Sequence, residues 1–313
     1  MNLQQLRYLH EVARQGLNVS AAASALFTSQ PGVSKQIRLL EEELGVVVFE
    51  RNGKRLTGIT EPGRLVLEGV ARALRDIDNL KRISSDYADE ASGTLDVATT
   101  HTQARYALPP VVKAFMASFP GVRLRLHQGN PEQVAAWTVQ GLADLGIATE
   151  ALDRSPRLLS LPCYQWSHVV IVPAGHPLAA EGSLSLAALA AYPLVTYDPT
   201  FTGRTRIDQA FARAGIDANV VLTAIDSDVI KTYVGLGLGL GIIAEMAYDP
   251  DRDADLVALP AGHLFESSTT RLAFRRDAHL RRFDHAFMEL FAPQLTRQLV
   301  AIARAGGGLD PGL

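Results

Sequence analysis

A long helical pattern between residues 60 and 87 divides this 313-residue chain into two parts with different periodicities. It opens with a cap and a first-turn proline in Thr60-Glu61-Pro62-Gly63, and its apolar positions then alternate spacings of four and three, except at Ser84. These positions are Val66, Val70, Ala73, Ile77, Leu80 and Tyr87. Such a seam packs either on its own domain or on a second copy of the helix. Because it joins two compact units, we expect pairing with a second copy.

The residues before this helix carry three shorter helical patterns. Apolar residues mark one helix face from Leu3 to Val12, and an alanine-rich stretch follows. A third helix starts at Ser29 or Gln30 and is closed by Gly45. Two short helices separated by a tight turn, the second of them amphipathic, predict a helix-turn-helix.

The third helix presents polar side chains of the types that reach base edges and phosphates in a major groove. A strand over residues 46–51, the turn Asn52-Gly53 and a return from Lys54 to Leu56 predict a hairpin wing with a basic tip. A solvated helix face and a solubilising tip are the alternatives, but the two features together favour phosphate contact. The candidate DNA-binding residues are Gln30, Pro31, Ser34, Lys35, Arg38, Arg51, Lys54 and Arg55.

Past Ser92 the chain alternates strand-like runs with helical stretches, which predicts an α/β fold with parallel sheets. The runs lie at residues 122–127, 144–148, 167–172, 193–196, 220–224 and 241–244. Open sheets of this kind bind ligands in a crevice at the carboxyl ends of their strands. We therefore expect a ligand site where several of these runs end.

The segment Ala98-Thr99-Thr100-His101-Thr102-Gln103-Ala104-Arg105-Tyr106-Ala107-Leu108-Pro109 places threonines on a strand-to-helix turn. A helix start offers unpaired N–H groups and the positive end of the macrodipole. The hydroxyls and the amide of this turn add hydrogen bonds without a full charge. A small anion or acid, such as sulfate or an amino-acid carboxylate, is the ligand we expect. A threonine cap followed by chance threonines is the alternative.

Charge and cysteine content exclude several classes of protein. The formal net charge of -3 gives no global affinity for nucleic acid, so DNA contact has to come from a local patch. The single cysteine, Cys163, excludes an intramolecular disulfide and is expected to be buried and inert. Residues 1–20 do not resemble a secretory signal, and the sequence has no apolar run of about 18 residues. A soluble, cytoplasmic protein without membrane contact is expected.

Catalytic and metal-binding motifs are absent from the sequence. The eight histidines do not pair at metal-ligand spacing, and no Gly-x-Ser-x-Gly or similar signature occurs. The run Gly235-Leu236-Gly237-Leu238-Gly239-Leu240-Gly241 follows a helix and precedes a strand, which is the wrong order for a dinucleotide cradle. We expect no enzyme activity, no metal and no cofactor.

The motifs resemble those of LysR-type transcriptional regulators. The resemblance rests on Leu3-Gln4-Gln5-Leu6-Arg7-Tyr8 and on Ser29-Gln30-Pro31-Gly32-Val33-Ser34-Lys35-Gln36. It narrows to the CysB-type regulators of cysteine biosynthesis through residues 98–109, Ile147-Ala148-Thr149-Glu150-Ala151, Phe201-Thr202-Gly203-Arg204 and Asp228-Val229-Ile230-Lys231-Thr232-Tyr233, and it covers roughly residues 1–300.

The resemblance implies three segments. A mainly α winged helix-turn-helix would occupy residues 1–59, and a linker or dimerisation helix residues 60–91. An α/β effector domain would occupy residues 92–313, with two Rossmann-like lobes as in periplasmic binding proteins. Lobe I would comprise about 92–162 and 268–300, and lobe II about 163–267.

An effector would lie between these lobes. The resemblance implies that Trp166 lines or neighbours the site, although packing in the core is the alternative. Glu150 suits an anion pocket only if the ligand also carries a positive group, so we hypothesise that it favours O-acetylserine over N-acetylserine; a solvated strand-end glutamate is the alternative. The candidate effector-binding residues are Thr100, Thr102, Gln103, Thr149, Glu150, Trp166 and Thr202.

The function that this resemblance implies is transcriptional activation of cysteine biosynthesis genes. O-acetylserine or N-acetylserine would be the effector, with sulfate or thiosulfate as competing anions. Expected partners are promoter DNA, further copies of the chain in a dimer or tetramer, and RNA polymerase. A regulator of sulfonate or sulfate-ester use is the alternative within the family. A small-anion solute-binding protein is the alternative from another class, but it would leave residues 1–90 unexplained.

Overall fold

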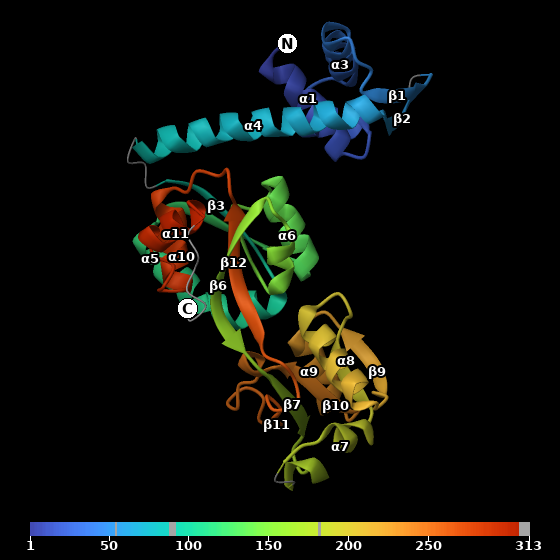
Figure 1. Ribbon diagram of the computed structural model, residues 1–313, viewed down its shortest axis with the longest axis vertical. Coiled ribbons are helices and arrows are strands. Elements are labelled where there is room, and N and C mark those ends of the chain that lie inside the picture. Colours follow the sequence, from blue (N-terminus) through green and yellow to red (C-terminus); the bar gives the residue numbers. More distant parts are fainter. Residues whose placement is uncertain (54, 88–91, 181–182, 307–313) are drawn as a thin grey trace. The chain divides into compact units, whose positions relative to one another are not determined.

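The computed structural model describes residues 1–53, 55–87, 92–180 and 183–306, and the chain forms two compact units that divide after Tyr87 (Figure 1). The first unit holds the predicted helix-turn-helix, and the second holds the predicted α/β domain. Within the described residues, every helix is too short or too polar to cross a membrane.

Three helices form the core of the first unit: α1 (Leu3–Arg14), α2 (Val19–Ala25) and α3 (Gln30–Leu44). Side-chain caps fix where they begin, because Asn18 accepts the N–H of Ala21 and Ser29 accepts that of Gly32. Gly45 ends α3 in the left-handed conformation, with φ of 66°. The helix-turn-helix is confirmed.

The wing consists of the antiparallel strands β1 (Phe49–Asn52) and β2 (Arg55–Ile59). The expectation of a strand from residue 46 was wrong. Glu41 of α3 accepts the backbone N–H groups of Val48 (2.8 Å) and Phe49 (3.1 Å) on one carboxylate oxygen. These N–H groups attach the start of the wing to α3. The pairing of β1 with β2 therefore begins only at Phe49.

The long helix α4 (Glu61–Tyr87) forms as predicted, but its apolar positions divide between two environments. Val66, Val70 and Ala73 pack into the hydrophobic core of the first unit. The expectation that the whole seam serves a second copy was therefore wrong for this half. Further along, Leu80 is 65% exposed, and pairing of that half with a second helix stays a prediction.

The first lobe of the second unit is a five-stranded sheet in the order β4-β3-β5-β12-β6. Its strands are β3 (Ser92–Thr99), β4 (Gly121–Gln128), β5 (Leu145–Ala148), β6 (Leu158–Trp166) and β12 (Ser268–Arg275). The helices α5 (Leu108–Ser118), α10 (Arg282–Phe291) and α11 (Arg297–Arg304) cover one face, and α6 (Pro131–Gln140) covers the other (Figure 1).

The second lobe has a five-stranded sheet in the order β11-β7-β10-β8-β9. Its strands are β7 (His168–Pro173), β8 (Leu194–Tyr197), β9 (Val220–Ala224), β10 (Leu240–Ala244) and β11 (Leu256–Pro260). One face packs against α7 (Leu186–Ala190) and α8 (Thr202–Ala214), and the other against α9 (Ser227–Gly235).

Both sheets are mixed, which corrects the expectation of parallel sheets. In lobe I, β12 runs antiparallel to β5 and β6, and in lobe II, β7 runs antiparallel to β10 and β11. The antiparallel strands are those that carry the chain between the lobes. The outward crossing leads from β6 to β7 at Ser167, and the return enters β12 at Ser268.

Candidate functional site

A small cavity of about 40 Å³ lies where strands of both lobes end. Strands β3 and β5 of lobe I and β8 and β10 of lobe II reach it with their carboxyl ends, as expected for open α/β sheets. We call it the inner cavity. It is lined by Thr100, Thr102, Gln103, Pro131, Ala148, Thr149, Trp166, Tyr197, Phe201, Thr202, Gly203 and Ala244. Six of the seven predicted effector residues are thus brought together, and Glu150 is not.

The turn that carries Thr100 and Thr102 leads directly into a π-helix. Residues 103–107 form it, and the N–H of Leu108 donates to the carbonyl of Gln103, five residues back. Pro109 and Pro110 follow and have no N–H to donate, so the carbonyls of the preceding turn lack two ordinary α-helical donors. Thr100 and Thr102, just ahead of this widened turn, line the cavity.

A direct hydrogen bond joins the two lobes across the inner cavity. Thr149, which follows β5, donates its hydroxyl to that of Thr202, the first residue of α8, at 2.7 Å. Each hydroxyl has further hydrogen-bonding capacity, because it can accept as well as donate. The pair can therefore close the lobes and still contact a ligand.

The Gln103 side chain is buried and serves the protein itself. Its amide NH₂ donates to Thr270 (3.1 Å) and contacts the sulfur of Met246 (3.8 Å), and its oxygen accepts from Tyr164. Burial raises the pKa of Tyr164 to about 12, so its hydroxyl remains a donor at neutral pH. Gln103 lines the cavity, but its amide NH₂ group and its amide oxygen already have partners within the protein.

Tyr197 is a site residue that the sequence analysis missed. It is 4% exposed, and its hydroxyl exchanges a 2.7 Å hydrogen bond with Ser227 and accepts the N–H of Ala244 at 2.9 Å. Burial raises its pKa. Tyr197, Ala148 and Ala244 all stand at the ends of strands, so the carboxyl-end rule could have found them.

The start of α8 approaches the strand that crosses between the lobes. A Cβ atom on Gly203 would lie 3.2 Å from Nε2 of His168 and 3.4 Å from the ring of Trp166. The indole N–H of Trp166 is buried and has no hydrogen-bond partner among the described residues. A buried donor in this situation favours an acceptor atom supplied by a ligand or a water.

Glu150 lies outside the inner cavity because other groups hold its carboxylate. One oxygen accepts the N–H of Thr269 at 3.2 Å and faces the guanidinium of Arg206 at 3.4 Å. Arg206 comes from α8 of lobe II, so this contact is a second link between the lobes. The other oxygen, Oε2, is buried and has no hydrogen-bond partner among the described residues. Glu150 therefore braces the lobes through one oxygen, and its contact with a ligand stays a prediction.

A larger cavity of about 220 Å³, which we call the outer cavity, adjoins the inner one at Phe201. Lobe I lines it mainly with amides, and lobe II with one carboxylate, one hydroxyl and two apolar side chains. Its residues are His101, Gln128, Gly129, Asn130, Gln133, Thr200, Phe201, Ile225 and Asp226.

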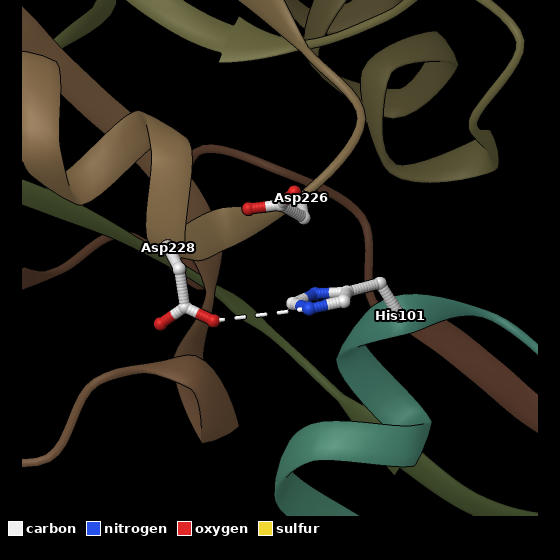
Figure 2. Close-up of side chains that lie close together, drawn as sticks. All are labelled: His101, Asp226 and Asp228. Atoms are coloured by element: carbon white, nitrogen blue, oxygen red, sulfur yellow. Dashed lines mark ion pairs between the residues drawn. The ribbon is translucent and has the colours of Figure 1, made fainter. Parts of the chain in front are cut away.

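Figure 2 shows the imidazole of His101 directed toward the carboxylates of Asp226 and Asp228. Ligand atoms of the three residues lie within 4.8 Å of one another, which sequence spacing did not reveal. Asp228 is already held by the Tyr106 hydroxyl (2.7 Å), Lys231 (3.4 Å), Arg105 (3.5 Å) and His101 (3.9 Å). Because two cations face Asp228, the arrangement is better explained as an ion-pair link between lobes than as a metal centre.

The candidate DNA-binding side chains of the first unit lie on α3 and the wing. Lys35, Arg38 and Arg55 are exposed, and Gln30 donates to the Ser34 hydroxyl at 3.2 Å. Arg51 instead forms an ion pair with Glu41, whose side chain is 7% exposed. Arg51 therefore helps to hold the wing against α3, and its contact with DNA stays a prediction. Lys54 lies outside the described residues.

Comparison with known proteins decides the family. Residues 3–64 match the bacterial regulatory helix-turn-helix protein, lysR family, and residues 88–296 match the LysR substrate binding domain. The chain belongs to the LysR family. The second matched region of this LysR-type regulator begins at residue 88, where its second compact unit also begins.

Relatives of this LysR-type regulator match it along nearly its whole length. The transcriptional regulator SsuR of Burkholderia cenocepacia is 56% identical over 96% of this chain and 98% of its own. CysB of the same organism is 50% identical over 98% of each chain. The crystal structure of the cofactor-binding domain of the Cbl transcriptional regulator superposes with a TM-score of 0.65, at 46% identity, over 68% of this chain and 93% of that one. The chain is thus a LysR-type transcriptional regulator related to SsuR, CysB and Cbl.

Proposed function

We propose that this LysR-type regulator controls sulfur-assimilation genes, those of cysteine biosynthesis first, and that it senses a small oxyanion or carboxylate in the inner cavity. The observation that carries the proposal is the meeting of Thr100, Thr102, Thr149 and Thr202 in one cavity, beside the start of α8 and the helical turn that follows β3. Helix N-termini and hydroxyl donors suit a compact anion.

The lining favours an effector that binds reversibly. None of the described residues that line the inner cavity is charged, so an anion there would not enter a full ion pair. The unpartnered indole N–H of Trp166 supports an acceptor oxygen in the same place. O-acetylserine and N-acetylserine are our effector candidates, and sulfate and thiosulfate would compete for the same donors.

Effector binding would act through the contacts that join the lobes. The Thr149–Thr202 hydrogen bond and the Glu150–Arg206 ion pair both change if one lobe tilts against the other. A ligand that prefers the closed lobes shifts the population toward them. We propose that this shift alters how a dimer or tetramer holds its promoter half-sites, and that the regulator activates transcription through RNA polymerase.

One observation favours a second candidate, the regulation of sulfonate or sulfate-ester use. The chain is 56% identical to SsuR and 50% identical to CysB. These are two differently named regulators of the same organism, and the chain is more similar to SsuR. The fold and the inner cavity would serve either regulon, since the three oxygens of a sulfonate match three of the four oxygens of sulfate.

Calorimetric titration of the full chain tests the proposal. The ligands are O-acetylserine, N-acetylserine, sulfate, thiosulfate and ethanesulfonate, and Thr102→Val removes one hydroxyl of the cavity. Saturable binding of an acetylserine that weakens in Thr102→Val supports control of cysteine genes. Binding of sulfate or ethanesulfonate without an acetylserine supports the second candidate, and binding of none of the five overturns the effector proposal.

A further inference from the structure

We infer that the outer cavity is an ammonium subsite, in which Asp226 binds the amine of a zwitterionic effector whose anionic head occupies the inner cavity. The inference rests on the proposed function of the inner cavity and adds the class of ligand. It replaces Glu150, which the sequence suggested for this role, by a carboxylate 76 positions further along the chain.

The two cavities adjoin at shared turns. Thr200 lines the outer cavity, Thr202 the inner one, and Phe201 between them lines both. On the other lobe His101 lines the outer cavity, while its neighbours Thr100 and Thr102 line the inner one. A ligand anchored by an anionic head at the threonines therefore has room to extend past Phe201 into the larger space.

Asp226 is the acid that this space offers. Among the described residues that line either cavity it is the only carboxylate. One of its oxygens caps α9 by accepting the N–H of Val229 at 2.8 Å, which fixes the side chain and leaves the second oxygen for a ligand. The start of α9 carries about half a positive charge, which a full carboxylate charge outweighs, so a cation is still attracted.

The neighbours of Asp226 reinforce this preference. Asp228 lies in the same cluster, and the nearby Lys231 is shared between Asp228 (3.4 Å) and the partly buried Asp253 (3.0 Å). Three carboxylates thus face two cations, Lys231 and Arg105, besides a histidine. An ammonium group supplies the missing positive charge.

The amides of lobe I complement the other atoms of such a ligand. The side-chain oxygens of Asn130 and Gln133 are both used in the capping box of α6. What these residues can offer is therefore their NH₂ groups, which would donate to a carbonyl or carboxylate oxygen beside the amine. The subsite combines one acidic acceptor with neutral donors.

Matched pairs of ligands test the inference by calorimetry on the full chain. The first pairs are 2-aminoethanesulfonate with ethanesulfonate and 3-aminopropanesulfonate with propanesulfonate; the second type is O-acetylserine with N-acetylserine, whose amine is blocked. We expect the free amine to strengthen binding roughly threefold to tenfold in at least one pair, the range of an exposed to partly buried charge contact.

Asp226→Asn keeps the helix cap and removes the charge, so it should abolish this gain, whereas ethanesulfonate and N-acetylserine should bind no more weakly than they do to the wild type. Asp217→Asn makes the same change on the exposed loop before β9, at the opposite end of the strands, and should keep the gain. Glu150→Gln should also keep it.

Two results would overturn the inference alone: no gain from the amine in any pair, or a gain that survives Asp226→Asn. If none of the anionic compounds binds at all, the proposed effector function fails together with it. The two failures are therefore distinguishable in the same titrations.

Discussion

The hydroxyls of Thr149 and Thr202 lie 2.7 Å apart and hydrogen-bond to each other across the two lobes of the effector unit. One follows a strand of lobe I and the other begins a helix of lobe II. The inner cavity therefore has this form only while the lobes are closed, because opening them separates the two hydroxyls. Several predictions depend on contacts of this kind.

Thr202→Val should weaken effector binding by roughly threefold to tenfold, the effect of losing one or two hydrogen bonds. The variant loses the bond to Thr149 and a hydroxyl of the cavity lining. Calorimetry with the tightest ligand found for the wild type measures it. Thr205→Val, an exposed position on the same helix, is the matched control. Equal affinities in both variants would contradict the role of Thr202.

Tyr106→Phe should increase local opening of α9 in lobe II without unfolding the lobe. Tyr106 donates to Asp228 at 2.7 Å, and Lys231 lies 5.2 Å from the centre of its ring. Burial alone would raise the pKa of Asp228, but the Tyr106 hydrogen bond and Lys231 outweigh it and hold this pKa below its usual value.

Hydrogen exchange of α9 without effector is the measurement, and we expect faster exchange in Tyr106→Phe. Tyr233→Phe removes a hydroxyl from an exposed tyrosine of α9 and should exchange like the wild type. The prediction fails if the two variants exchange at the same rate.

His168 should make the effector unit sensitive to mild acid. Burial lowers its pKa from 6.5 to about 4, so the unfolded chain takes up a proton below pH 6.5 while the folded chain does not. Stability contributed by the neutral side chain is present above pH 6.5 and is lost as the pH falls toward 4. The loss between pH 7 and pH 5 is about 2 kcal/mol.

Urea unfolding at several pH values, followed by tryptophan fluorescence, checks this slope. Both tryptophans, Trp137 and Trp166, belong to the second unit, so the signal reports that unit alone. His168→Leu should show a shallower decline than the wild type over this range. Parallel declines would assign the acid sensitivity to other groups.

Arg38→Ala should weaken promoter binding at every sequence and lower the salt slope by about one, as expected for a lost phosphate contact. Arg51→Ala should chiefly destabilise the first unit, since it leaves the buried Glu41 without its cation. Fluorescence anisotropy with labelled DNA at several salt concentrations, combined with thermal melting, separates the two effects. A reduced salt slope for Arg51→Ala without a lower melting temperature would reverse this assignment.

Local signals in the sequence predicted the helices and strands and most of the polar residues that line the inner cavity. The caps at Asn18 and Ser29 and the stop at Gly45 were readable because each acts on its own neighbours within the chain. The threonines at residues 100, 102, 149 and 202 were found because each stands where a strand ends or a helix begins, and such positions converge in an open sheet.

The errors have a common physical cause, which is competition from partners distant in sequence. Glu41 takes the N–H groups that would have extended the wing, and the core of the first unit takes half of the α4 seam. Arg206, 56 residues away, binds one oxygen of Glu150, which the sequence did not predict. The spacing of residues along the sequence does not reveal these contacts.

The sequence by itself determined the order of the elements, the family and the neutral, hydroxyl-rich character of the inner cavity. The tertiary structure alone decided which of the two acids lines a cavity, because the contacts that set this come from residues distant in sequence. Glu150 is bound by a guanidinium and a backbone N–H, whereas Asp226 spends one oxygen on a helix cap and turns toward the outer cavity. Charge pairing between lobes acts through space, and only folding brings those charges together.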